Sequence, residues 1–177
     1  MAILTGSEII KRINTDIIID PFNPDQIGPN SYDLRLGGQI VILDPAHDIF
    51  DGEQGSKGRT IEMKKGEQIC FMPGWFYLCH TEEYTETRNL VPCIEGRSSA
   101  ARQGLSVHLS AGFGDIGFCG QWVLEVTAAI PVIVTIGQRI CQISYQTIEG
   151  ATVDYADKGR YNGQRGVVLS KGLGEVK

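Results

Sequence analysis

Hydroxyl and guanidinium groups gather in residues 95–105, directly after a short apolar run, and together they could bind phosphate. The apolar run is expected to end as a strand at Gly96, and the next residues open a short helix of about two turns that Gly104 stops. The free N–H groups and the positive dipole at a helix start suit an anion. The candidate phosphate ligands are Arg97, Ser98, Ser99 and Arg102. Taken alone, such a segment is more often an ordinary serine cap beside two solvated arginines.

One carboxylate interrupts a strongly apolar stretch, residues 121–127. If this stretch is a strand, alternation puts Glu125 on one face with Val123 and Thr127, and the other face carries Trp122, Leu124 and Val126. A carboxylate in such surroundings reaches solvent or a partner, or its pKa rises above the usual value near ~4.3. A raised pKa would suit Glu125 to general acid–base catalysis. The alternative is an outward-facing strand glutamate without a chemical role.

A glycine-rich segment, residues 111–120, separates these two features and could let backbone approach a ligand closely. Asp115 lies within it and could accept a hydrogen bond from a sugar hydroxyl. An ordinary glycine-rich hairpin connection explains the same pattern.

A partial zinc-deaminase pattern is present but incomplete. Such enzymes carry H-x-E and later P-C-x-x-C, and this chain has His80 and Glu82 followed by Pro92 and Cys93. Position 96, where the second cysteine should stand, is Gly96. Two candidate ligands are too few for a catalytic zinc site with three protein ligands. We therefore expect no zinc, with His80 at the end of a strand and Cys93 in the core.

The elements that must position these residues are mostly short strands. A helix is expected from a Thr5–Glu8 capping box to near Asn14. The strands expected from alternation and turn residues are 32–36, 39–43, 60–63, 68–72, 75–81, 90–94, 105–109, 121–127, 132–135 and 138–145. This spacing favours an all-β barrel, sandwich or jelly roll. After Gly150 the chain becomes polar and glycine-bearing, so we expect residues 1–150 to form the domain and residues 151–177 a flexible closing segment.

Composition limits the function classes. The chain has 177 residues, with 42% hydrophobic and 21% charged residues, as in a single globular domain. A net charge of −5 argues against polymeric nucleic acid as a partner. The chain shows neither a membrane-spanning run nor a signal peptide. Five cysteines among apolar residues are read as reduced core thiols, which predicts a cytoplasmic protein.

Several of these segments, in order, resemble dCTP deaminase of the dUTPase superfamily. The similar stretches cover nearly the whole chain: residues 30–37, 72–78, 96–108, 111–120, 124–125 and 159–166. The resemblance implies a mostly β, jelly-roll or β-clip fold with short helices near the N-terminus and after Gly96. It also implies a homotrimer whose active sites are shared between subunits.

The same resemblance implies hydrolysis of dCTP to dUTP and ammonia without zinc, with Mg²⁺ entering on the triphosphate and not on protein side chains. Glu125 would move protons between water, the cytosine N3 and the leaving amine, and Arg102 and Ser98 would complete the catalytic site. The implied substrate-binding residues are Arg97, Ser98, Ser99, Arg102, Ala111, Asp115, Tyr155, Arg160 and Gln164.

The loop at residues 114–117 departs from the family's usual Ile-Asp-Pro-Gly, because Gly114 and Ile116 replace the aliphatic residue and the proline. We expect this change to make the base pocket roomier or more mobile than in a typical relative, with tolerance of 5-substituted deoxycytidine nucleotides. Three alternatives stay open beside dUTP formation: a bifunctional enzyme that releases dUMP and diphosphate, a plain dUTPase, and a nucleotide-binding regulatory trimer without activity.

Overall fold

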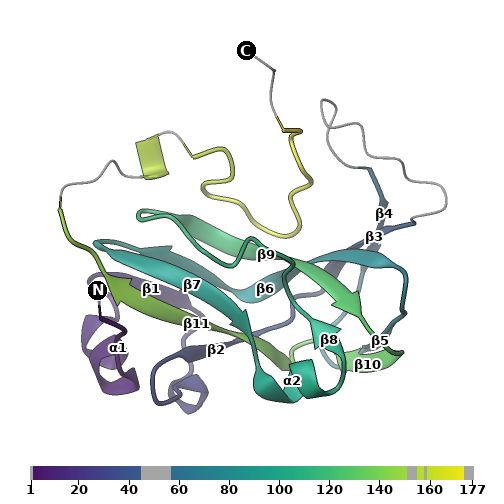
Figure 1. Cartoon of the computed structure of the whole chain (residues 1–177), viewed down its shortest axis with the longest axis horizontal. Coiled ribbons are helices and arrows are strands. Elements are labelled where there is room, and N and C mark those ends of the chain that lie inside the picture. Colours follow the sequence, from purple (N-terminus) through teal and green to yellow (C-terminus); the bar gives the residue numbers. More distant parts are fainter. Residues whose placement is uncertain (1, 45–56, 151–154, 158, 174–177) are drawn as a thin grey trace.

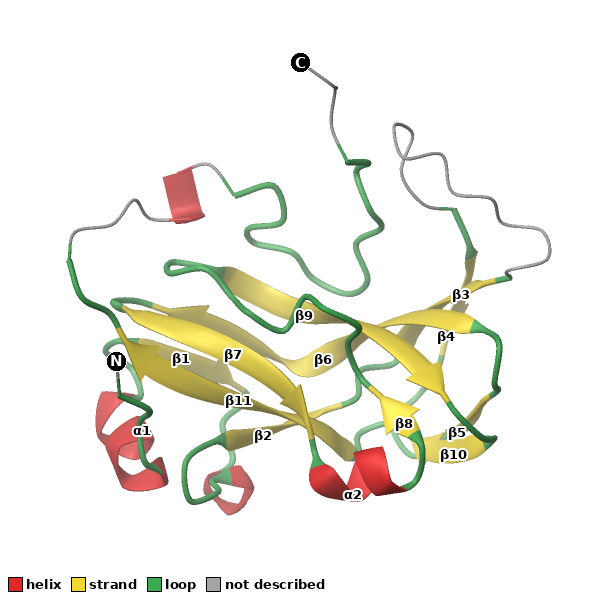
Figure 2. Cartoon of the chain, in the orientation of Figure 1, coloured by secondary structure: helices red, strands yellow, loops and turns green. Residues whose placement is uncertain are grey.

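The computed structural model describes residues 2–44, 57–150, 155–157 and 159–173. The strands dominate, and the short helices lie at the periphery (Figures 1 and 2). The elements are α1 (Gly6–Arg12), β1 (Ile17–Asp20), η1 (Pro24–Gln26), β2 (Tyr32–Arg35), β3 (Gln39–Leu43), β4 (Arg59–Glu62), β5 (Gln68–Phe71), β6 (Phe76–Thr87), β7 (Leu90–Gly96), α2 (Ser98–Arg102), β8 (Leu105–Ser106), β9 (Cys119–Ala128), β10 (Val132–Thr135), β11 (Arg139–Thr147) and η2 (Tyr155–Asp157). The predicted mostly-β fold with two short α-helices is confirmed.

The described strands form three antiparallel sheets. The largest has the order β4-β3-β6-β9-β8, with β1 also paired to β6. A second sheet has the order β2-β11-β7, and β5 pairs with β10. The ranges predicted for β3 and β10 match the structure. The strand predicted at 75–81 overlaps the first part of the longer β6, and the strand predicted at 105–109 ends at Ser106.

The N-terminal helix begins as its sequence predicts and ends slightly earlier. Thr5 Oγ1 accepts a hydrogen bond from the Glu8 N–H at 3.4 Å, which confirms the cap. The helix stops at Arg12 because Ile13 turns to an extended ψ of 134° and Asn14 adopts a φ of 65°. Ile9 is buried in the core, whereas Ile10 of the expected apolar stripe is exposed.

One hydrophobic core joins the two larger sheets. It includes inward side chains of β2, β6, β7, β9 and β11 in a single cluster. Along β9 every second residue is buried, and Trp122, Leu124 and Val126 face the core as predicted. A smaller cluster on the largest sheet is formed by Val41 and Leu43 of β3 and by Leu78 of β6. It packs against Val167 and Leu169.

The described part of the C-terminal region runs over β9 (yellow in Figure 1). Part of the predicted closing segment, residues 151–154, 158 and 174–177, lies outside the described residues. No helix in the described part of the chain is long and apolar enough to cross a membrane.

The cysteines are free thiols in the structure, but they do not all lie in the core. Cys79 and Cys141 are buried, whereas Cys93 and Cys119 are half-buried. Cys70 is exposed, so its prediction as a core thiol is wrong. The reason is its place in β5, where burial alternates and Cys70 points outward between Ile69 and Phe71.

A fully buried carboxylate connects β6 to β2. Glu83 Oε1 accepts from Arg35 Nε at 2.6 Å and from Gln26 Nε2 at 3.0 Å, and Glu83 Oε2 accepts from the Arg35 N–H at 2.8 Å. The Glu83 side chain has no solvent exposure, so its charge depends on these partners.

We predict that Arg35→Ala strongly destabilises the fold, because it leaves the Glu83 charge buried without its cation. Breaking such a pair typically costs about 3–5 kcal/mol of unfolding free energy. The matched control is Arg88→Ala, which removes the exposed Arg88–Glu86 pair and should cost roughly 0–1 kcal/mol. Urea unfolding measures both. Equal, small losses would contradict this role for Glu83.

Candidate active site

Strand β9 presents Glu125 on the face opposite to its core residues. The predicted alternation is confirmed, since Val123, Glu125 and Thr127 are half-buried and their neighbours are buried. Glu125 Oε2 accepts a hydrogen bond from the Leu109 N–H at 3.4 Å. Burial raises the pKa of Glu125, while the Leu109 N–H and the nearby His108 partly oppose the rise. The carboxyl group therefore holds its proton to a higher pH than an exposed glutamate does.

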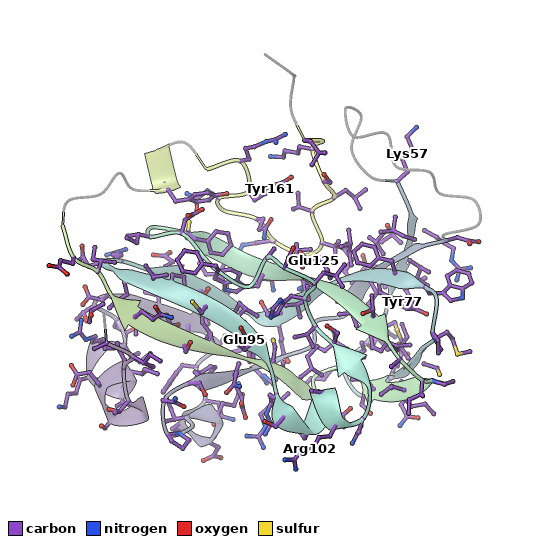
Figure 3. The ribbon with its side chains drawn as sticks, in the orientation of Figure 1. Lys57, Tyr77, Glu95, Arg102, Glu125 and Tyr161 are labelled. Carbon is purple, nitrogen blue, oxygen red and sulfur yellow. The ribbon has the colours of Figure 1, made fainter. Side chains whose placement is uncertain are left out.

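A cavity of about 590 Å³ opens above Glu125. Five predicted site residues line it together: Ala111, Asp115, Glu125, Tyr155 and Gln164. Figure 3 shows Glu125 on β9, below the C-terminal segment that carries Tyr161. The volume is that of a small-molecule site.

Aromatic side chains that sequence reasoning missed form much of the cavity wall. The cavity is lined by Phe76, Phe113, Phe118, Trp122 and Tyr161 in addition to Tyr155. The ring centroids of Phe118 and Trp122 are 4.5 Å apart, and those of Phe118 and Tyr155 are 6.0 Å apart. The aromatic content of residues 113–122 and 155–161 was the available signal, but only the fold brings these two segments together.

The space beside Gly114, where the sequence suggested extra room, is occupied in this structure. A Cβ atom at Gly114 would lie 2.4 Å from Trp122 Cη2 and 2.8 Å from Pro92 Cγ. The space that an aliphatic side chain would take is already filled by the Trp122 ring. Trp122 is held in place because its Nε1 donates to Thr85 Oγ1 at 2.9 Å.

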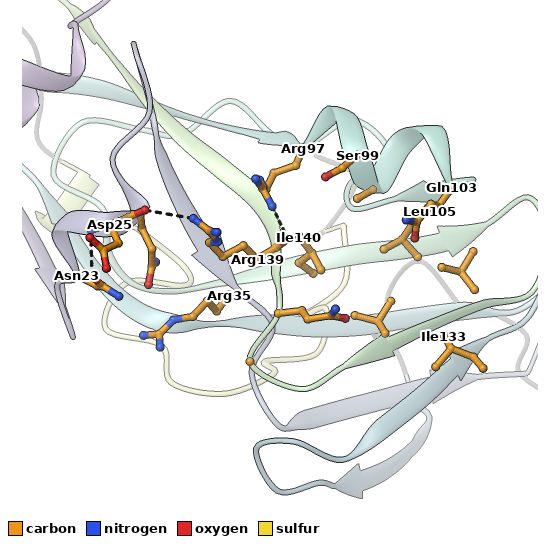
Figure 4. Close-up of a pocket in the computed structure, with 16 residues that line it drawn as sticks. Asn23, Asp25, Arg35, Arg97, Ser99, Gln103, Leu105, Ile133, Arg139 and Ile140 are labelled. Atoms are coloured by element: carbon orange, nitrogen blue, oxygen red, sulfur yellow. Dashed lines mark hydrogen bonds between the residues drawn. The ribbon is translucent and has the colours of Figure 1, made fainter.

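The predicted phosphate-binding residues lie elsewhere on the chain. Arg97 and Ser99 line a separate cavity of about 600 Å³, together with Arg35 and Arg139 (Figure 4). Asp33 holds two of these cations, because its carboxylate lies 3.1 Å from Arg97 Nε and 3.4 Å from Arg139 Nη1. Burial raises the pKa of Asp33, against the pull of both arginines. This arginine cavity offers guanidinium donors that a phosphate can bind, although Arg35, Arg97 and Arg139 are each also paired with a carboxylate in the single chain.

Helix α2 carries the two remaining catalytic candidates. It has five residues, so it is shorter than the predicted two turns, and its N-cap is Arg97 without a side-chain capping bond. Neither Ser98 nor Arg102 lines either cavity. Figure 3 shows Arg102 at the far edge of the molecule from Glu125. A single chain therefore does not bring Ser98 and Arg102 to the Glu125 carboxylate.

Arg160, predicted to close over phosphates, contacts its own segment here. Its Nη1 donates to the Gly172 carbonyl at 3.0 Å and its Nη2 to the Lys171 carbonyl at 2.8 Å. Gln164, in contrast, lines the Glu125 cavity.

His80 has no free nitrogen for a metal. It lies within β6 and is buried, so its predicted place at a strand end is wrong. Its Nε2 accepts from the Gln39 N–H at 3.2 Å, and its Nδ1 lies 2.8 Å from the Thr81 carbonyl. Among the described residues no group of three or more His, Cys, Asp or Glu side chains could hold a metal ion.

Known proteins resemble this chain over most of its length. A family model described as dCTP deaminase-like matches residues 3–148. A protein of Leptospira biflexa named "dCTP deaminase, dUMP-forming" is 43% identical over 165 residues, which are 93% of this chain and 92% of that protein. One of the same name from Hathewaya histolytica is 42% identical over 165 residues, with 93% and 94% covered.

The fold is also found in a solved structure. The crystal structure of 2′-deoxycytidine 5′-triphosphate deaminase from Agrobacterium tumefaciens matches with a TM-score of 0.64 and 20% identity, over 88% of this chain. This chain spans about half the length of that structure, since 50% of it is covered. Because the family model covers residues 3–148 and relatives above 40% identity match 93% of the chain, the chain belongs to the dCTP deaminase-like family.

Proposed function

We propose that this protein hydrolyses dCTP to dUMP in two steps. In the first, dCTP and water give dUTP and ammonia; in the second, dUTP and another water give dUMP and diphosphate. The observation that carries the proposal is the half-buried Glu125 at the floor of a nucleoside-sized cavity. The names of the relatives support dUMP formation more than release of dUTP, which was the first expectation from sequence.

The deamination step needs a group that both accepts and donates protons. Glu125 takes a proton from water as the oxygen attacks C4 of cytosine, and it delivers a proton to N3. The tetrahedral carbon then expels the amino group as ammonia after a further proton transfer. A carboxylate whose pKa is raised toward the working pH performs such transfers efficiently.

The rest of the cavity suits a deoxynucleoside. Its aromatic wall supplies flat apolar surface for a base, the backbone near Ala111 offers polar groups, and Asp115 supplies an acceptor for the sugar 3′-hydroxyl. Tyr155 and Gln164 cover the ligand from the C-terminal side.

The triphosphate requires the arginine cavity, which one chain places away from Glu125. We infer a homotrimer in which α2 and the arginine cavity of one subunit complete the Glu125 site of its neighbour. Arg97, Ser98 and Ser99 then contact phosphates, and Arg102 with Ser98 positions the attacking water. Arg160 exchanges its carbonyl contacts for phosphate.

Magnesium belongs to the substrate in this proposal. Guanidinium and hydroxyl groups at the predicted phosphate position can bind phosphate oxygens, and the nearby carboxylate of Asp33 is already paired with Arg97 and Arg139. Mg²⁺ would shield the triphosphate charge, while the protein residues orient the phosphates. Zinc has no place in the proposal, because both His80 nitrogens are engaged.

Product analysis tests the proposed reaction. The protein is incubated with dCTP and Mg²⁺, and dCTP, dUTP and dUMP are separated by ion exchange. We expect dUMP with little free dUTP. Accumulation of dUTP would indicate an enzyme that only deaminates. Turnover of dUTP without turnover of dCTP would indicate a plain dUTPase. Nucleotide binding without turnover of either would indicate a regulatory protein.

Glu125→Gln should abolish most turnover and leave the fold intact. The amide has nearly the same shape, but it cannot carry protons, so kcat should fall by about 10²–10⁴-fold or more. At pH 5 the melting temperature should stay near that of the wild type, and so should the nucleotide affinity. Glu67→Gln is the matched control, since its side-chain oxygen can still accept from the Lys64 N–H. A loss of less than about tenfold in Glu125→Gln would exclude the assigned role.

The raised pKa of Glu125 also predicts a pH dependence of stability. The native state binds the Glu125 proton more tightly than the unfolded state does. The contribution of Glu125 to stability is therefore full below the ordinary glutamate pKa of 4.5, and it is lost as the pH rises through the raised native pKa. Glu125→Gln lacks this loss. The melting temperature of the variant, relative to that of the wild type, should therefore be higher at pH 8 than at pH 5. A difference that does not change between these pH values would contradict the burial of the charge.

Mixing two inactive variants tests the shared site. Arg102→Ala and Glu125→Gln are refolded together at equal amounts, so that subunits assort randomly. If each site takes Glu125 from one subunit and Arg102 from the next, about one quarter of sites regain both groups. The control pairs Arg102→Ala with the double variant and should recover nothing. If mixed trimers form but regain no activity, the shared site is contradicted. A monomeric mass by light scattering would contradict it as well.

A further inference from the structure

Two glutamine side chains hold the C-terminal segment, residues 159–173, where it crosses the largest sheet. Gln121 Oε1 accepts from the Gly166 N–H and Gln39 Oε1 accepts from the Val167 N–H, each at 2.6 Å. These glutamines belong to β9 and β3, which lie on either side of β6. Two consecutive N–H groups are thus bound from two different strands.

The amide groups of both glutamines are oriented by second partners. Gln121 Nε2 donates to the Glu82 carbonyl at 3.0 Å, and Gln39 Nε2 donates to Glu62 Oε1 at 2.6 Å. Each amide nitrogen is therefore engaged by the sheet, so that each oxygen is directed to the segment.

Backbone pairing along β9 adds to this contact. The Gln121 N–H donates to the Gln164 carbonyl at 3.0 Å, and Gln164 Nε2 donates back to the Gln121 carbonyl at 2.8 Å. The Gly163 N–H donates to the Cys119 carbonyl at 2.7 Å. The Cys119 N–H and thiol both donate to Asn162 Oδ1, at 2.9 and 3.2 Å. The segment thus extends the sheet at the start of β9.

Gly166 lies at the point of contact, and its backbone conformation and its closeness to Gln39 both favour glycine. Its φ is 65°, in the region that favours glycine, and a Cβ atom would lie 2.6 Å from Gln39 Oε1. Gly163 has a similar φ of 75°, but a Cβ atom there would meet nothing within 4 Å. The two glycines therefore differ in the contact with Gln39, not in backbone conformation.

Past the glutamines the segment alternates between two surfaces. Val167 and Leu169 pack on the small cluster of Val41, Leu43 and Leu78. Val168 and Ser170 line the Glu125 cavity. The glutamine contacts fix the register of this alternation, and so they determine which side chains face the cavity.

We propose that Gln39 and Gln121 are positioning residues that seat the C-terminal segment as one wall of the active site. They do not touch the substrate; they hold Gln164, Val168 and Ser170 in the cavity wall. This role for catalysis rests on the proposed function, whereas the seating of the segment is a property of the chain itself.

The test compares Gln121→Leu, Gln39→Leu and the double variant with Gln68→Leu, an exposed glutamine of β5 as control. Opening of the segment is measured without substrate in two ways. The first is the rate of iodoacetamide modification of Cys119, read by mass spectrometry against the exposed Cys70. The second is the rate of tryptic cleavage after Arg165, whose guanidinium lies 4.5 Å from the Tyr84 ring centroid.

We expect each lost side-chain bond to raise both rates by about 2- to 10-fold, and the double variant to show the larger increase. Rates equal to those of Gln68→Leu would overturn the proposal. If a glutamine variant fails to fold, Gly166→Ala tests the same contact from the segment side, with Gly163→Ala as its matched control. Gly166→Ala should open the segment more than Gly163→Ala, and equal opening would overturn the proposal.

Kinetics then separate this proposal from the proposed function. With dCTP as substrate, the glutamine variants should raise KM more than they lower kcat, because the catalytic carboxylate is untouched. A wild-type protein without turnover would refute the proposed function, yet the two rates above would still decide whether the glutamines seat the segment. Open variants with an unchanged KM would overturn the active-site role.

Discussion

The antiparallel pairing of β9 with β6 is the constraint on which the candidate site depends. It places Leu78 opposite Glu125 and Cys79 opposite Leu124, so that Glu125 is fixed on an apolar strand in the middle of the sheet. Because Trp122, Leu124 and Val126 anchor the other face of β9 in the core, the strand cannot rotate to expose the carboxylate to bulk water. The raised pKa of Glu125 follows from this packing.

An irregularity in the pairing of β6 with β9 affects both the aromatic wall above Glu125 and the arginine cavity. The register between β6 and β9 shifts between His80 and Tyr84. Within this stretch Thr81 Oγ1 accepts from the Trp122 N–H at 3.0 Å, which compensates for the interrupted ladder. Glu83 is directed to Arg35, at the edge of the arginine cavity. One strand therefore supports the aromatic wall above Glu125 and the cationic cavity that we assign to the neighbouring site.

Local patterns predicted the parts of the structure that depend on local physics. Alternation identified β3, β10 and the outward face of Glu125, and the capping box identified the start of α1. The errors concern contacts between distant segments. The Trp122 ring fills the space beside Gly114. Pairing with other strands extends β6 past its predicted end. Neither contact can be inferred from residues that are neighbours in sequence. Arg102 lies far from Glu125 in the single chain, and only the proposed trimer would bring the two residues into one site.

Burial on β9 raises the pKa of Glu125, and the proposed reaction uses this carboxyl group as its proton carrier. The most direct test of this role is a titration of the Glu125 side-chain carboxyl carbon by ¹³C NMR, with Glu125→Gln to assign the resonance. We expect a midpoint above the ordinary value of 4.5. A midpoint at or below 4.5 would exclude Glu125 as the proton carrier, because its carboxylate would then be solvated or paired rather than buried.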